Sequence, residues 1–70
     1  MDKNMNFLMD LERTFNFNKP FFWKPNKFGY TNFLNEAGLY SDKEAEEIKG
    51  QDFEGRTVIV PLSVVKGILK

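Results

Sequence analysis

Apolar side chains recur at helical spacing near the start of the chain. Met5, Leu8 and Met9 follow the i, i+3, i+4 pattern of an amphipathic helix. Neither Pro nor Gly interrupts residues 3–15, and Asp2 stands where an N-cap is expected. The pattern therefore predicts a helix over residues 3–15.

Aromatic residues dominate the segment that follows. Residues 21–23, Phe-Phe-Trp, prefer strands. Residues 25–29 contain a Pro that presets φ and a Gly that permits positive φ, and residues 30–34 form a second strand candidate. The segment predicts an antiparallel hairpin, after which residues 35–38 bulge or continue the second strand. Because strand side chains alternate, the second face of the hairpin needs cover from the N-terminal helix or from a partner.

Residues 41–44, Ser-Asp-Lys-Glu, form the sequence signature of a capping box. In this motif the Ser41 hydroxyl accepts from the amide of Glu44, whose side chain accepts from the amide of Ser41. Gly50 is a natural helix stop. A short helix over residues 42–49 is expected, with Ala45 and Ile48 on its inner side.

Two elements are predicted near the C-terminus. Residues 57–60 are mostly apolar and β-branched, which predicts a buried strand that ends at Pro61. Residues 63–70 follow as a short helix capped by Ser63. The assembled pattern predicts an α+β fold in one small domain, residues 1–70. Its antiparallel sheet, the hairpin plus a third strand, packs with the N-terminal helix and the short capped helix on one face.

Composition narrows the possible chemistry. The chain has neither Cys nor His, so disulfides and the commonest metal ligands and catalytic bases are excluded. Ser41 and Ser63 are explained as helix caps, and no phosphate-binding glycine loop or metal-binding spacing occurs. We therefore expect a non-enzymatic protein with no catalytic residues, no cofactor and no metal. No apolar run approaches the length of a membrane span, which argues against a membrane protein. The absence of Cys is compatible with the cytoplasm, which is the expected location.

The charges are segregated although they sum to zero. Residues 13–33 carry four cations and no acid, whereas residues 34–55 carry seven acids against two lysines. Such asymmetry is a candidate interaction signal, although unlike charges on a helix and a hairpin also arise by chance.

Aromatic residues exceed what a core of this size readily hides, which favours a binding surface. A protein partner, or a second copy in a homodimer, would cover the surplus; the plain alternative is that the rings form the core. A different reading is single-stranded nucleic-acid binding, with bases stacked on the rings of residues 13–33 beside their lysines. The candidate partner-binding residues are Trp23, Lys24, Lys27, Phe28 and Tyr30 on the hairpin and Asp42, Glu46 and Glu47 on the acidic helix.

Residues 23–45 contain the pattern W-x-P-N-x-x-G-Y-T followed by E-A-G-x-Y-S-x-x-E-A. Together with the strand before Pro61, it resembles small uncharacterised proteins of phages and mobile elements. The resemblance covers about residues 21–62 and implies a compact ββαβ unit with no assigned catalytic residue. It also implies a host or defence-system protein as the partner, for example inhibition of the kind exerted by anti-CRISPR proteins, in the host cytoplasm.

Overall fold

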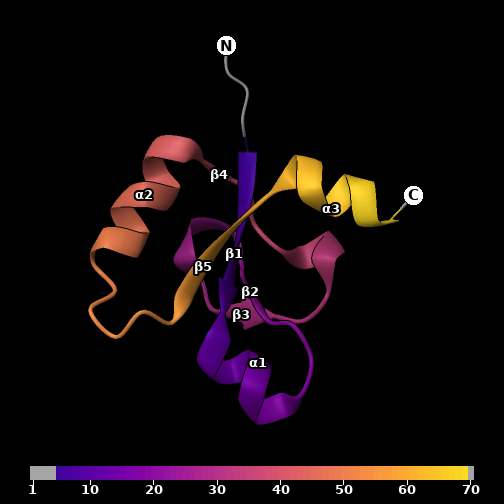
Figure 1. Ribbon diagram of the computed structural model, residues 1–70, viewed down its shortest axis with the longest axis horizontal. Helices are drawn as coiled ribbons and strands as arrows, with labels where there is room; N and C mark the ends of the chain where they lie inside the picture. The colour runs from indigo at the N-terminus through magenta and orange to yellow at the C-terminus, as the bar shows by residue number, and fades with distance from the viewer. Residues whose placement is uncertain (1–4, 70) are drawn as a thin grey trace.

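The computed structural model describes residues 5–69 and has an α+β fold, an antiparallel sheet packed with helices (Figure 1). The elements in chain order are β1 (Met5–Asp10), α1 (Leu11–Phe17), β2 (Phe22–Trp23), η1 (Pro25–Lys27), β3 (Tyr30–Thr31), η2 (Leu34–Glu36), β4 (Tyr40–Ser41), α2 (Asp42–Gly50), β5 (Thr57–Pro61) and α3 (Leu62–Leu69). The predicted fold class is confirmed.

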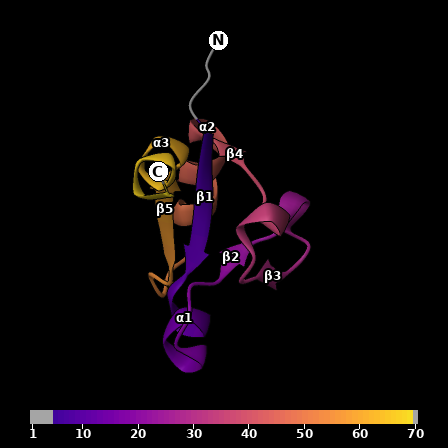
Figure 2. The same cartoon turned by 90° about the vertical axis from the view of Figure 1, so that its right-hand side faces the viewer.

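Strand β1 lies at the centre of the sheet. It pairs with β5 along one edge, from Asn6 opposite Pro61 to Asp10 opposite Thr57. Its other edge is shared by β4 and β2, and β2 continues into β3. Figure 2 shows β5, β1, β2 and β3 side by side across the sheet. Every one of these pairings is antiparallel.

The predicted helix over residues 3–15 is wrong in its first half. Residues Met5–Asp10 form β1, and the helix begins only at Leu11. Asp10 is its N-cap, accepting from the backbone N–H of Arg13 at 2.9 Å. The helical spacing of apolar residues arises here in a strand, because β1 has neighbours on both edges and both faces. Adjacent residues such as Phe7 and Leu8 are therefore both buried, and the alternation typical of a half-exposed strand is lost. The predicted cap Asp2 lies outside the described residues.

Helices α2 and α3 lie on opposite faces of the sheet (Figure 1). The N-terminal helix that the sequence predicts on the same face as α2 is reduced to α1, which follows β1. On the α2 side, Leu8 packs with Tyr40, Ala45 and Ile48, and Trp23 lies against this cluster. On the other side, Phe7 and Phe22 are buried with their ring centroids 5.7 Å apart. Alternation along β1 and β2 thus divides the aromatic residues between two small cores.

The local predictions after residue 20 largely hold. The hairpin forms, although its strands are only two residues long, and residues 34–36 turn into η2. Helix α2 has both hydrogen bonds of the predicted capping box between Ser41 and Glu44. The last helix begins at Leu62, so Ser63 lies within its first turn and is not the N-cap. None of the helices within residues 5–69 is long and apolar enough to cross a membrane.

Candidate binding groove between helix α2 and the hairpin

Helix α2 covers only part of its face of the sheet. It packs on β1, β4 and β5, and the β2–β3 hairpin extends beyond it. Two cavities, of about 290 and 430 Å³, lie between this helix and the hairpin. Both are lined by Lys27 from the hairpin and by Ile48 and Gln51 from the end of α2, so the two cavities adjoin at these residues. We call this feature the α2–hairpin groove.

The tip of the hairpin is a tight turn with unusual backbone angles. Asn26 and Lys27 have φ values of 59° and 63°, and Gly29 has a φ of 107°. Positive φ is costly for residues with a Cβ, so neighbouring contacts must hold the turn. One such contact is the backbone hydrogen bond from Lys24 N to Gly29 O at 2.8 Å.

Tyr40 fastens this turn to the sheet. Its hydroxyl donates to the Lys24 carbonyl at 2.5 Å and accepts from the backbone N–H of Lys27 at 3.0 Å. The side chain itself is buried beside Leu8 and Ile48. The position of Lys27 at the groove therefore depends on a tyrosine thirteen residues further along the chain.

Gly38 makes the second contact with the turn. Its N–H donates to the Trp23 carbonyl at 2.9 Å. A Cβ at this position would lie 2.6 Å from the Cα and N of Pro25, closer than real Cβ atoms approach. The close backbone approach therefore requires glycine.

Several residues of the 23–45 pattern hold the turn or cap a helix. Besides Gly38 and Tyr40, Thr31 is buried, and its hydroxyl donates to Glu36 and accepts from the N–H of Phe33, both at 3.1 Å. Ser41 caps α2. These residues fold the hairpin against α2, and Tyr40 also lines the groove.

Trp23 is half-buried at the inner side of the groove. Its ring meets that of Tyr30 edge-on, with the centroids 5.6 Å apart. The indole Nε1–H is buried and has no hydrogen-bond partner within the described residues. The Arg13 guanidinium lies 3.9 Å from the centroid of the Tyr30 ring and 3.5 Å from the Asp10 carboxylate. An orphaned buried donor is uncommon in folded proteins and costs stability.

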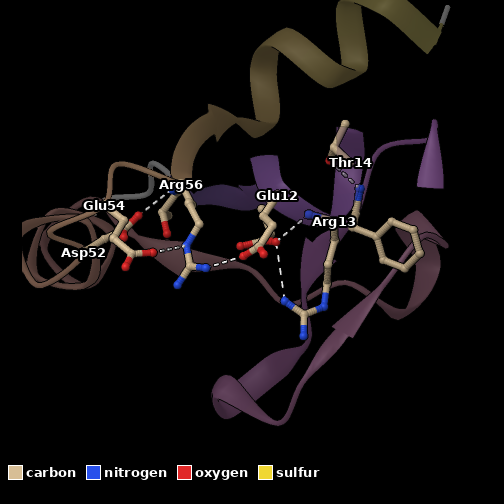
Figure 3. A network of polar contacts seen from close by, with 9 residues as sticks. Glu12, Arg13, Thr14, Asp52, Glu54 and Arg56 are labelled. Atoms are coloured by element: carbon tan, nitrogen blue, oxygen red, sulfur yellow. Dashed lines mark hydrogen bonds and ion pairs between the residues drawn. The ribbon is translucent and has the colours of Figure 1, made fainter. Parts of the chain in front are cut away.

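Asp52 and Arg56, which line the groove, belong to a polar network (Figure 3). Asp52 accepts from the backbone N–H of Thr57 at 2.6 Å. Arg56 pairs with Glu54 at 3.3 Å and reaches across to Glu12 at the start of α1. The network ties the loop between α2 and β5 to α1.

Two groups of this network have shifted pKa values. Desolvation works to raise the pKa of the Asp52 carboxyl, but hydrogen bonds from Thr57 and from nearby backbone amides outweigh it and lower that pKa. The charge of Glu54, followed by the hydrogen bond to Glu12, raises the pKa of the Arg56 guanidinium. Both groups are therefore held in their charged forms.

The predicted partner-binding residues divide into three sets. Four of them line the groove: Trp23, Lys27, Tyr30 and Glu47. Phe28 is 78% exposed at the hairpin tip, next to Lys27, and Lys24 is half-buried with its carbonyl bound to Tyr40. Asp42 and Glu46 lie on α2 outside the groove lining, and Asp42 accepts a hydrogen bond of 2.7 Å from the buried Asn6.

Sequence reasoning missed several lining residues. Gln51 and Asp52 follow the predicted helix over residues 42–49, Thr57 begins the predicted strand, and Asp10 lies within the predicted helix over residues 3–15. A signal existed at Asp10, since Ser, Thr, Asn and Asp before an apolar residue favour an N-cap. The pairing of β1 with β5 brings Asp10 and Asp52 to the same groove. The spacing of these two residues in the sequence does not indicate this pairing.

Several large apolar side chains are exposed outside the groove. Phe15 and Phe17 on α1 are 77% and 60% exposed, and Phe53 in the loop before β5 is 97% exposed. No group of three or more Asp and Glu within residues 5–69 is arranged to hold a metal ion. Comparisons with protein-family models, with curated proteins and with solved structures found no match.

Proposed function

We propose that this protein is a non-enzymatic binding protein that holds a segment of another protein in the α2–hairpin groove. The observation that carries the proposal is the cavity beside α2 that is lined by the half-buried rings of Trp23 and Tyr30. Exposed aromatic surface rimmed by polar side chains is typical of protein interfaces, and Trp and Tyr are frequent anchors. Phe28 extends this surface at the hairpin tip.

The partner class that we favour is a host or defence-system protein. This part of the proposal rests on the resemblance of residues 21–62 to small phage and mobile-element proteins. A protein of this kind would act by occupying a surface of its target, because the chain lacks His and Cys for the commonest forms of catalysis.

Two contacts argue against nucleic acid as the ligand of the groove. Trp23 and Tyr30 meet edge-on, and the Arg13 guanidinium covers one face of Tyr30, so Tyr30 does not offer two open faces to a base. Arg13 is also paired with Asp10, which lowers its value for phosphate binding. Titration with single-stranded oligo(dT) is expected to leave the fluorescence of Trp23, the only Trp, unchanged; a salt-sensitive quench would favour nucleic acid.

Site-specific crosslinking tests the proposal. A photoreactive phenylalanine analogue at position 28 is expected to give a discrete protein adduct in the lysate of cells that carry the gene. The control places the same analogue at Val64, which is exposed on α3 on the opposite face. Equal adducts from both positions, or no adduct from position 28, would overturn the proposal.

A further inference from the structure

The charged residues of the α2–hairpin groove do not balance. Its lining contains four carboxylates and only two cations. The carboxylates are Asp10, Asp52, Glu44 and Glu47, and the cations are Lys27 and Arg56. The groove therefore presents an excess of negative charge to whatever enters it, although residues 13–33 of the hairpin are basic as a segment.

Most of these charges already have partners. Asp10 pairs with Arg13, Asp52 accepts from Thr57, and Arg56 pairs with Glu12 and Glu54. The Glu44 carboxylate accepts from the backbone N–H of Ser41 in the capping box. Among the lining carboxylates of the described structure, Glu47 alone has no hydrogen bond or ion pair, and its side chain is exposed.

The aromatic wall suits a guanidinium. The molecule itself provides the example, because Arg13 places its guanidinium 3.9 Å from the centroid of Tyr30. Trp23, next to Tyr30 in the same wall, is the strongest aromatic partner for a cation. A planar guanidinium can lie on such a ring and still bind a carboxylate with its N–H groups.

The orphaned Trp23 Nε1–H requires an acceptor. A main-chain carbonyl of a bound segment would supply one, and this would remove the cost of the buried unpaired donor. Because Nε1 is buried, a carbonyl reaches it only if lining side chains move, and the neighbouring Lys27 and Gln51 are long and exposed.

We propose that the α2–hairpin groove binds an extended segment of the partner protein through an arginine, whose guanidinium lies against the Trp23–Tyr30 wall and is attracted by Glu47, which lines the adjoining cavity, while a main-chain carbonyl of the segment accepts from Trp23 Nε1. The inference rests on the proposed function and names the chemistry that the groove recognises. Charge complementarity with the surplus carboxylates selects a basic segment over an acidic one.

The test is a titration of the ¹⁵N-labelled protein with the peptide acetyl-Leu-Arg-Leu-amide, followed by NMR. The single Trp gives one indole N–H signal, which reports directly on Trp23. We expect a saturable shift of this signal with the arginine peptide, and binding weaker by about two- to fivefold with the matched citrulline peptide, which keeps the shape and removes the charge.

Two variants of α2 localise the effect. Glu47→Gln is expected to weaken binding of the arginine peptide by about two- to fivefold. Glu46→Gln is the matched control, because Glu46 is exposed on the same helix but does not line the groove. Both side chains are exposed, so neither variant should impair folding.

Four results would overturn the inference: no indole shift at millimolar peptide, equal binding of the citrulline peptide, equal losses in both variants, or tighter binding of a glutamate peptide. If these appear while position 28 still crosslinks to a partner, protein binding stands and the arginine assignment is wrong. If crosslinking also fails, the proposed function is wrong.

Discussion

Single residues decide the shape of the hairpin tip. Gly38 allows two backbone segments to touch, and the Tyr40 hydroxyl bonds to both sides of the turn. Gly38 does not line the groove and Tyr40 lines only the cavity beside Asn26, yet both set where Lys27 and Trp23 lie. A change at either position should therefore alter stability and the groove together.

Gly38→Ala should destabilise the protein by about 1–3 kcal/mol, because the new methyl group meets Pro25 backbone that cannot easily move. Urea unfolding measures the change. Gly50→Ala is the matched control: no atom lies within 4 Å of its added Cβ, and alanine is the better helix former. Equal losses in the two variants would contradict the close-approach argument.

Tyr40→Phe keeps the buried ring but removes the hydroxyl that joins the Lys24 carbonyl and the Lys27 N–H. We expect a loss of about 1–3 kcal/mol, since both backbone groups lose a partner in a partly buried position. Hydrogen exchange of the Lys27 amide should accelerate more than that of the β1 amides. Unchanged exchange at Lys27 would show that the turn holds its strained angles without this contact.

At the scale of elements, β5 shows how an edge strand is protected. The hydrogen bond from Leu11 N to Arg56 O shows which residues of β5 bond to β1, since hydrogen-bonded and non-hydrogen-bonded pairs alternate along an antiparallel ladder. By this alternation Thr57, Ile59 and Pro61 direct their backbone groups away from β1. Asp52 accepts from the outward N–H of Thr57, Lys49 donates to its carbonyl at 3.1 Å, and Pro61 has no N–H. Little of the outer edge is left for another strand to pair with.

Asp52→Asn tests this edge and has a predictable pH dependence. The folded-state pKa of Asp52 lies below its ordinary value of 3.8, so the carboxylate contributes stability that is fully present above that pH. The contribution is lost as the pH falls from 3.8 through the folded pKa. The stability difference between wild type and Asp52→Asn should therefore be largest near neutral pH and shrink below pH 3.8. Chemical unfolding at several pH values measures it, and a constant difference would contradict the assignment.

At the scale of the whole molecule, a sheet with a helix on each face leaves one area uncovered. Helix α2 packs on β1, β4 and β5, and the groove lies where the β2–β3 hairpin extends beyond it. The remaining exposed aromatic residues, among them Phe53, add apolar surface elsewhere. With no net charge to keep copies apart, such surface favours association with a partner or with another copy.

The two classes of phenylalanine should respond differently to truncation. Phe22→Ala removes a buried ring that packs on Phe7 and should cost about 3–5 kcal/mol. Phe53→Ala should change stability by less than about 0.5 kcal/mol, because its ring is almost fully exposed. Thermal unfolding of the two variants separates these cases. A large loss for Phe53→Ala would mean that the ring packs on another copy or on part of the same molecule.

The local elements could be predicted from sequence because their signals lie within a few residues. The Ser41–Glu44 capping box, the turn after Trp23 and the β-branched run before Pro61 each specify nearly their own structure. They predicted α2, the hairpin and β5, and through them the α+β class. Four of the eight predicted binding residues also line the groove, because the hairpin and α2, which carry the aromatic and charged residues, form its two sides.

The tertiary structure alone decided the role of residues 5–10 and hence the existence of the groove. Met5–Asp10 has apolar spacing that fits a helix, but it becomes the central strand because β5, about fifty residues later, supplies its hydrogen-bond partners. Pairings at such separation leave no local trace in the sequence. The sequence alone determined the turns, the hairpin, α2 and β5. How these elements pack decided which face of the sheet each covers and that a groove forms beside Trp23.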